Sequence, residues 1–484
     1  MKKNFNLKKR VIIGLFLLGT IFLFYCVNYL VYANFTFNGT LYNVEDDADG
    51  GGGWSSHSQS FYCEENDRWY ILYPVDSSVN YFVGYYSFTD SGNLTTWNNG
   101  GAITGLLVQT VQNFPKRTSL LSWTYDNNNS LGHIVYVDTV ATTLNYKNFT
   151  IDVDGSIIGG SVKILPPSFC YYGVVDICLD PNGIPMISVF TYTGADHFAC
   201  GYICDSSDGY NEEWTLTYFD PYPTQTYGSI MGIPLGESTL LIVAQSLTAQ
   251  SPLRAFKIEN GVTSNSSGQG TIFSDNSVHF SNSGVSYNYN VYGFMGCSWN
   301  STHGTIQYCD YSTHNPFIFS FDFDTLTRDI EYQIGTEGES SYWGIWNGVT
   351  VNNEEFFSVT LWYATGSTYS SLVANENFYN SQVWNSTQIV LDEFEDEYGW
   401  HYIGTCTSRF TDTNNNTLVL THLDGVFDGV AVTFITCNGF IEEGNGNGNG
   451  LEDPFDWSGI KWILALIVAI IIFSFAVYIK GGRR

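Results

Sequence analysis

Five aromatic residues recur at intervals of about 51–65 residues, each at the start of a short, mostly apolar segment: Tyr172, Tyr227, Tyr292, Trp343 and Trp400. Aromatic rings stack on sugar faces and partner surfaces, and they also fill wedge-shaped cores. The recurrence gives them equivalent positions in a repeated unit. We therefore expect them either to surround the mouth of a central channel, where they bind a glycan or a protein, or to pack between units.

Carboxylates could support a different chemistry, because glycoside hydrolysis uses a pair of them. Asp176 lies in the third apolar segment, but no second carboxylate occupies a matching position. The sequence also lacks His-Glu-x-x-His, Gly-x-Ser-x-Gly and Gly-Lys-Ser/Thr motifs. We predict no catalytic or metal residue and no cofactor, with a carbohydrate-active hydrolase as the alternative. The acidic runs 45–47 and 392–397 are calcium candidates, with solvated loops as the other interpretation.

The elements that position these residues repeat in a fixed order. The third unit reads GVVDICL, IPMISVFTYTG, HFACGYICD and WTLTYFD, and the sixth unit follows the same order. Four short strands joined by hairpins and repeated around a ring predict an all-β fold, a seven-bladed β-propeller. Six or eight blades, or tandem β-sandwiches, are the alternatives. The last unit is one strand short, so we expect residues 34–43 to supply that strand and close the ring.

Two turns resemble the Asp-box of sialidase-like propellers, Ser-x-Asp-x-Gly-x-Thr-Trp. One spans residues 89–92, followed by Trp97, and the other spans residues 206–209, followed by Trp214. The resemblance implies a propeller in which the Asp caps a hairpin and the Trp packs between strands. It implies no sialidase activity, since the arginines Arg68, Arg117, Arg254, Arg328 and Arg409 form no recognisable triad.

Charge and hydropathy predict how the chain is arranged across a membrane. The chain has 484 residues and a net charge of −29, yet both ends are basic. Such an acidic chain excludes nucleic-acid binding. An apolar run at residues 11–33 follows the basic N-terminal end, and a second apolar run at residues 462–479 precedes the basic C-terminal end. We predict the following segments: 1–33, a signal peptide or anchor; 34–441, an extracellular propeller; 442–456, a Gly/Asn linker; 457–480, a transmembrane helix in lipid; and 481–484, a cytoplasmic tail.

Sequons and cysteines agree with an outside location, on an archaeal cell or a viral envelope. The predicted glycosylation sites are Asn34, Asn38, Asn93, Asn128, Asn148, Asn265, Asn300, Asn385 and Asn415. We expect Cys297 and Cys309 to face each other across a hairpin as a disulfide, and Cys406 to pair with Cys437. Three disulfide pairings are possible among the four cysteines of the third unit, Cys170, Cys178, Cys200 and Cys204. Cys63 is then left without a predicted disulfide partner. The predicted function is adhesion or recognition, with a structural envelope component as a further alternative.

Overall fold

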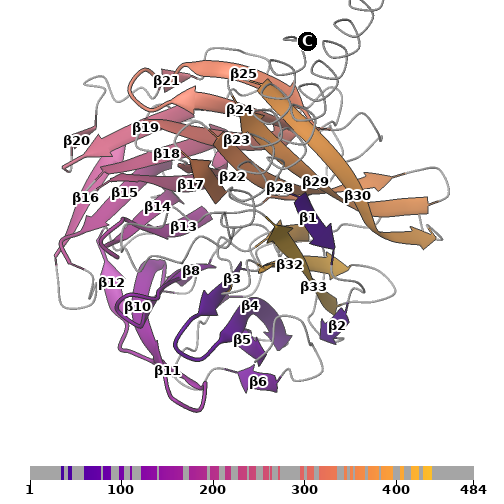
Figure 1. The fold of residues 1–484 in the computed structure, drawn as a ribbon. Helices are drawn as coiled ribbons and strands as arrows, with labels where there is room; N and C mark the ends of the chain where they lie inside the picture. The colour runs from indigo at the N-terminus through magenta and orange to yellow at the C-terminus, as the bar shows by residue number, and fades with distance from the viewer. Residues whose placement is uncertain are drawn as a thin grey trace, which may run out of the picture. The chain divides into compact units, whose positions relative to one another are not determined.

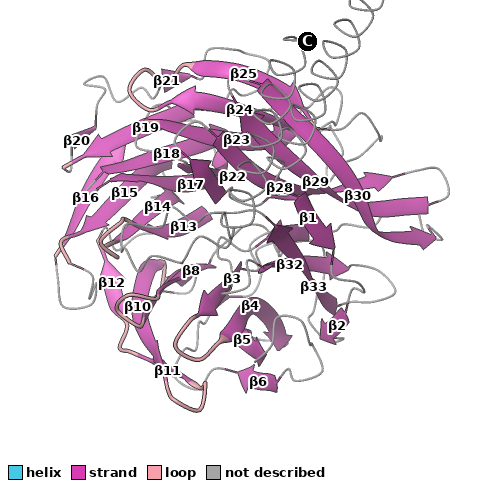
Figure 2. Cartoon of the chain, viewed as in Figure 1, coloured by secondary structure: helices cyan, strands magenta, loops and turns pink. Residues whose placement is uncertain are grey.

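The computed structural model describes the backbone of strands and turns between residues 34 and 438, with gaps, and fewer side chains. The side chains described are those of residues 60–71, 122–138, 141–166, 175–189, 200–206, 213–217, 230–236, 239–242, 255–260, 262, 302–307, 317–328, 331–334, 383, 412 and 434–435. All regular structure within the described residues is β-strand (Figure 2).

The described strands form seven antiparallel sheets, numbered here in chain order (Figure 1). Sheet 1 contains β3 (Gln59–Cys63), β4 (Arg68–Ser77), β5 (Asn80–Phe88), β6 (Asn98–Ala102) and β7 (Thr110–Val111). Sheet 2 contains β8 (Leu121–Asp126), β9 (Leu131–Asp138), β10 (Thr143–Ile151), β11 (Ile157–Gly159) and β12 (Lys163–Leu165). Sheet 3 contains β13 (Val174–Leu179), β14 (Pro185–Tyr192), β15 (His197–Cys204) and β16 (Trp214–Phe219).

The remaining sheets repeat this order. Sheet 4 contains β17 (Tyr227–Gly236), β18 (Thr239–Ser246), β19 (Arg254–Glu259), β20 (Val262–Thr263) and β21 (Thr271–Ile272). Sheet 5 contains β22 (Met295–Ser298), β23 (His303–Cys309), β24 (Pro316–Asp322) and β25 (Arg328–Gln333). Sheet 6 contains β26 (Trp343–Ile345), β27 (Val349–Asn352), β28 (Glu355–Thr365), β29 (Tyr369–Asn380) and β30 (Val383–Glu395). Sheet 7 contains β31 (Gly404–Thr407), β32 (Asn416–Leu423), β33 (Gly429–Asn438), β1 (Asn34–Phe37) and β2 (Tyr42–Glu45).

Each sheet has four strand positions, and in five of the seven sheets one position is filled by two short strands; the strands follow chain order in sheets 1 to 6, whereas β1 and β2 fill the last position of sheet 7. In sheet 2, for example, β11 and β12 pair with the same strand β10, on either side of a break at Gly160. The Gly160 amide donates to the Asn148 carbonyl at 2.8 Å, so the break keeps a backbone hydrogen bond. The strand order of the third unit matches the sequence-based expectation from β13 to β16.

The first strands of successive sheets contact one another in chain order, β3 with β8, β8 with β13, β13 with β17, and β17 with β22. β26 likewise contacts β31, and β31 contacts β3, which joins the last sheet to the first. Contacts between first strands thus link sheets 1 to 5 in one series and sheets 6, 7 and 1 in another, an order typical of a β-propeller and different from the pairwise stacking of β-sandwiches.

The N-terminal strands complete sheet 7, as expected for residues 34–43. β1 pairs antiparallel with β33, with Asn34 opposite Asn438 and Phe37 opposite Ile435. β2 continues along the same strand, with Tyr42 opposite Val432. The first and last described strands of the ring are therefore hydrogen-bonded neighbours.

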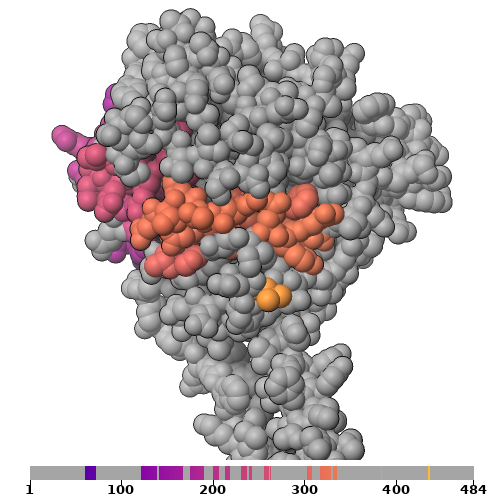
Figure 3. All heavy atoms as spheres, turned by 90° about the horizontal axis from the view of Figure 1, so that it is seen from above, coloured from indigo at the N-terminus to yellow at the C-terminus, as the bar shows by residue number. Residues whose placement is uncertain are grey.

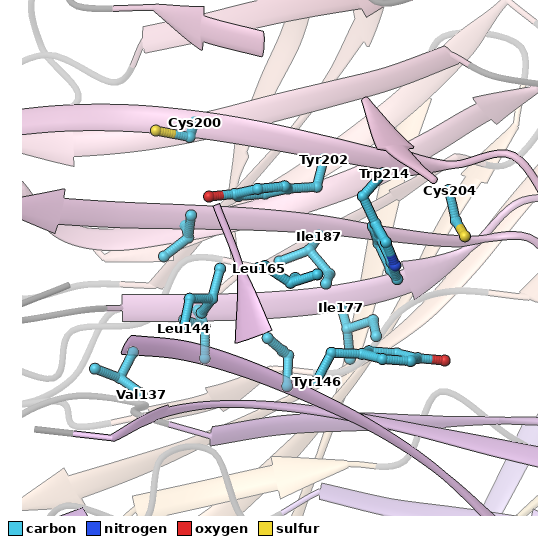
Figure 4. Packing of buried hydrophobic residues seen from close by; sticks show 13 residues of the cluster. Val137, Leu144, Tyr146, Leu165, Ile177, Ile187, Cys200, Tyr202, Cys204 and Trp214 are labelled. Carbon is cyan, nitrogen blue, oxygen red and sulfur yellow. The ribbon is translucent and has the colours of Figure 1, made fainter. Parts of the chain in front are cut away.

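Side chains of one strand are buried on both faces of its sheet. On β9, Ile134 packs in a cluster toward sheet 1, whereas Val135 and Val137 pack in a cluster toward sheet 3. Figure 4 shows the second cluster, in which Tyr146 and Trp214 lie between the two sheets. Burial on both faces explains why this strand is a continuous apolar run and does not alternate.

Among the described residues, no helix is long and apolar enough to cross a membrane. Segments 11–33 and 462–479 lie outside them.

Candidate functional site

Asp176 is the best-defined polar group on the innermost strands. Its side chain comes from β13 and is 6% exposed. One carboxylate oxygen accepts a hydrogen bond from the Ser122 hydroxyl of sheet 2 at 3.1 Å. The other accepts from the Gly232 backbone N–H of sheet 4 at 3.0 Å. One carboxylate therefore joins three neighbouring sheets at their inner strands.

The surroundings of Asp176 fix its position further. The Ile177 backbone N–H donates to the Ser122 hydroxyl at 3.2 Å, so Ser122 binds β13 twice. Ser188, opposite Asp176 on β14, is fully buried. A Cβ at Gly232 would lie 3.3 Å from the Cys178 sulfur and 3.4 Å from the Ser188 hydroxyl, so a larger residue would require these neighbours to shift by a few tenths of an ångström. The sequence analysis singled out Asp176 but not Ser122 or Gly232, which lie 54 and 56 residues away from it.

The first hairpin turns of sheets 1 and 2 also interlock. The Asn127 side chain accepts from the Glu64 backbone N–H at 3.0 Å and donates to the Tyr62 carbonyl at 3.0 Å. The turn of sheet 3 adjoins them, because a Cβ at Gly183 would lie 2.0 Å from an Asp126 carboxylate oxygen. The first turns of three sheets therefore lie side by side on one face of the ring.

The turn between the third and fourth strands of sheet 2 lies on the same face. The Arg68 guanidinium donates to the Asp154 carbonyl at 2.6 Å, and the buried Tyr70 hydroxyl donates to the Gly155 carbonyl at 3.0 Å. Burial raises the pKa of Tyr70 from 10.0 to about 12. We call this side of the molecule, which carries the first-to-second and third-to-fourth turns, the turn face.

Aspartates cap two third-to-fourth turns that the sequence analysis missed. The Asp154 carboxylate accepts from the Ser156 N–H at 2.8 Å and from its hydroxyl at 2.6 Å, and these bonds lower the Asp154 pKa. In sheet 5, the Asp322 carboxylate accepts from the Thr325 N–H at 2.7 Å, which lowers the Asp322 pKa. Asp154 follows the third strand of sheet 2 and Asp322 ends the third strand of sheet 5, each within a short Asp-x-Asp run. That position in the repeat is a signal from which the two turns could have been predicted.

The proposed Asp-box turns lie largely outside the described residues, but one of their tryptophans is described. Trp214 is buried at the start of β16, and its ring packs edge-on against Tyr146 of sheet 2, with centroids 5.0 Å apart. It therefore packs between two sheets, whereas the resemblance implied packing between strands. Residues 89–92, 207–209 and Trp97 lie outside the described part of the chain.

The two arginines with described side chains bind protein groups. The Arg68 guanidinium donates a hydrogen bond to the Asp154 carbonyl. Arg328, on the outer strand β25, forms an ion pair with Glu331, and its guanidinium lies 5.7 Å from the centre of the Phe319 ring. Neither lies on an inner strand.

An ion pair joins the third strand of sheet 4 to the turn between the third and fourth strands of sheet 5. Lys257 of β19 and Asp324 of the sheet 5 turn form an ion pair at 3.5 Å. Figure 3 shows the described residues of these two sheets, in pink to orange, adjoining on the surface.

The strand registers correct both expected disulfide pairs. On β22 and β23, Cys297 lies opposite Thr305, four residues from Cys309. Four residues of strand span about 13 Å, more than the Cα separation that a disulfide tolerates. Cys406 lies opposite Leu420 on β32, whereas Cys437 on β33 lies opposite Phe35. Because β32 separates those two strands, Cys406 and Cys437 are not neighbours.

The buried cysteines of sheets 1 and 3 form no disulfide with one another: Cys63, Cys178, Cys200 and Cys204. Cys178 faces sheet 4, whereas Cys200 and Cys204 face sheet 2. Figure 4 shows Cys200 and Cys204 at opposite ends of their cluster. Burial raises the pKa of the Cys204 thiol, which disfavours the thiolate that metal binding and redox chemistry require. Cys170 lies outside the described residues.

The five aromatic candidates are placed only in part. Tyr227 and Trp343 begin β17 and β26, as expected for first strands. Their side chains, and all of Tyr172, Tyr292 and Trp400, lie outside the described residues, as do the side chains of the two acidic runs. Within the described set, no group of three His, Cys, Asp or Glu residues could hold a metal ion.

A buried lysine was also missed by the sequence analysis. Lys147 on β10 is buried, and burial lowers the pKa of its ammonium group. It lies on the face of sheet 2 that meets sheet 1, since its neighbour on the same face, Phe149, packs against Phe61.

No protein-family model matches the chain, and no curated protein matches it. Among solved structures, it is similar to a PL25 ulvan lyase, with 8% identity, a TM-score of 0.48, and coverage of 83% of this chain and 95% of that one. A Dos1 propeller has 9% identity and a TM-score of 0.40, with coverage of 82% and 94%. A GH93 α-L-arabinofuranosidase of Fusarium graminearum has 9% identity and a TM-score of 0.40, with coverage of 65% and 92%.

Proposed function

We propose that the chain is a recognition protein of an archaeal cell surface or a viral envelope, with a seven-bladed propeller head outside the membrane. Residues 457–480 would anchor the head, and residues 442–456 would be a flexible spacer. The ligand would be a glycan or a protein. Basic ends beside apolar runs and sequons spread through the head support this topology.

The burial and the hydrogen bonds of Asp176 support ligand recognition over hydrolysis as the function. A catalytic carboxylate must reach the substrate as an acid, a base or a nucleophile. Asp176 is buried, and each of its oxygens accepts a hydrogen bond from a neighbouring sheet. Its role in this structure is to tie the inner strands together. This leaves ligand recognition to the loops and to the strand starts.

The ligand would bind on the face opposite the turn face. A first strand that ends at the turn face begins on the other side, where Tyr227 and Trp343 stand. Aromatic rings around the channel mouth would offer flat apolar surfaces to sugars or to an apolar protein patch.

Full-length protein in lipid nanodiscs tests this proposal on a glycan array and by affinity capture from host extracts. Wild type should bind a restricted set of glycans or one protein, and Tyr227→Ala or Trp343→Ala should weaken binding at least tenfold. Val153→Ser is the matched control, since Val153 is 90% exposed on the turn face. Blank results in both assays at high protein concentration would refute recognition, and unchanged affinity of both aromatic variants would refute the proposed face.

A further inference from the structure

Three consecutive asparagines form the first turn of sheet 2, and two of them have structural roles. Asn127 bridges to the sheet 1 turn through two hydrogen bonds of 3.0 Å. Asn129 donates its side-chain amide to an Asp126 oxygen at 2.6 Å. Among the contacts described for this turn, none involves the Asn128 carboxamide, and the residue is exposed. The turn therefore presents one of its three amides to solvent.

The backbone of this turn is held in place. Asp126 accepts from the Asn128 N–H at 2.9 Å and from the Asn129 N–H at 3.4 Å. Ser130 adopts a positive φ of 50°, which turns the chain into β9. Asn128 consequently projects from a fixed position, two residues before the Ser130 hydroxyl, in the order Asn-x-Ser.

We propose that Asn128 carries an N-linked oligosaccharide and that the neighbouring sequon at Asn148 does not. The donor would be an oligosaccharide joined to a lipid phosphate or diphosphate. The Asn128 amide nitrogen would form a bond to the anomeric carbon, the bond from that carbon to the phosphate oxygen would break, and its electron pair would leave with the lipid phosphate. The amide would lose one proton. This inference rests on the extracellular location of the head.

The folded chain leaves more space for a glycan at Asn128 than at Asn148. Asn148 lies within β10, is half-buried, and its side-chain oxygen would lie 2.1 Å from a Cβ at Gly160. Its carboxamide thus packs into the space that a glycine leaves at the break between β11 and β12. A glycan there would have to displace the edge of the sheet, whereas a glycan at Asn128 displaces only water.

Glycopeptide mass spectrometry of the full chain, purified from the organism that makes it, tests the inference. The peptide with Asn128 should carry a hexose-containing mass addition, and the peptide with Asn148 should be unmodified. Asn128→Gln should remove one glycan from the intact mass, and Asn148→Gln should change only the residue mass. An unmodified Asn128 beside other modified sequons, or a modified Asn148, would overturn the inference alone. No modified sequon anywhere would overturn it together with the extracellular location.

Discussion

At the scale of single residues, the described inner strands hold a buried carboxylate whose role is structural. Asp176 accepts hydrogen bonds from two different sheets, and both donors are covered by protein. A buried donor that loses its acceptor has no water to replace it. Single substitutions can therefore measure how much these two hydrogen bonds of Asp176 contribute to the free energy of unfolding.

Asp176→Ala should lower the free energy of unfolding by roughly 1–3 kcal/mol, because the Ser122 hydroxyl and the Gly232 N–H would lose their acceptor. Urea unfolding followed by tryptophan fluorescence measures this. The control Asp324→Ala removes a surface carboxylate that is 83% exposed and paired with Lys257, and it should cost less than about 1 kcal/mol. Equal effects of the two variants would argue against the junction.

Tyr70 should make stability fall at high pH. Its pKa is 10.0 in the ordinary case and about 12 in the folded chain. The folded state therefore keeps a proton that the unfolded state releases, so this contribution is full below pH 10 and is lost as the pH rises toward 12. Tyr70→Phe should cost roughly 1 kcal/mol at neutral pH through the lost bond to Gly155. It should also flatten the pH dependence of the melting temperature above pH 10; an unchanged slope would contradict the assignment.

At the scale of elements, neighbouring sheets are held together by their turns as well as by their inner strands. Asn127 reaches from the second sheet to the backbone of the first sheet. Arg68 and Tyr70 reach from the first sheet to the outer turn of the second. Such contacts fix the angle between sheets where apolar side chains alone would permit sliding.

Asn127→Ala should destabilise the protein by roughly 1–3 kcal/mol, since the Glu64 N–H and the Tyr62 carbonyl would lose their partner. Asn182→Ala is the matched control: Asn182 is an exposed asparagine in the sheet 3 turn, where its backbone N–H donates to Asp180. Thermal unfolding of both variants measures the difference. A melting temperature of Asn127→Ala as high as that of Asn182→Ala would show that the bridge contributes nothing.

The sequence predicted the order of the strands well, because each strand carries its own signal. The third unit could be divided into β13 to β16 from its apolar runs and the turn residues between them. The pairing of Cys297 with Cys309 failed because it assumed a turn centred between them. The observed register is centred on residue 301, two positions earlier. Turn conformation sets the register, and apolar periodicity does not report it.

The candidate site was predictable only in part. The apolar run around Asp176 marked an inner strand, but its partners Ser122 and Gly232 belong to other units and are chemically unremarkable in the sequence. Their role follows from the way the sheets stack around the ring. The Asp154 and Asp322 turns could have been found from their position after a third strand.

At the scale of the whole molecule, the ring is closed by segments from opposite ends of the head. β1 and β2 pair with β33 although they are separated from it by most of the chain. Without them, β33 would expose an unpaired edge, which favours aggregation.

Deletion of residues 34–45 should therefore lower the melting temperature by about 1–3 °C, the order of shift that about 1–2 kcal/mol produces in a head of this size, and should promote self-association. Scanning calorimetry and analytical ultracentrifugation measure the two effects. Deletion of residues 444–449, in the spacer, is the control and should change neither. A monomeric deletion variant that melts like the wild type would contradict closure by the N-terminal strands.

The turn face and the opposite face would have different roles. A glycan on Asn128 would cover part of the turn face, and the partner would then bind where Tyr227 and Trp343 begin their strands. Enzymatic removal of glycans should therefore leave the affinity for the partner within about twofold; a rise or loss of tenfold would place the partner on the turn face.

The most direct test of recognition without catalysis measures turnover and stability together. Full-length wild type and Asp176→Asn would be incubated with a panel of chromogenic glycosides and polysaccharides, and the unfolding of each protein would be recorded in parallel. The account predicts no turnover by either protein and a less stable Asp176→Asn. Turnover by wild type that disappears in Asp176→Asn, with the fold intact, would contradict it and make the chain a hydrolase.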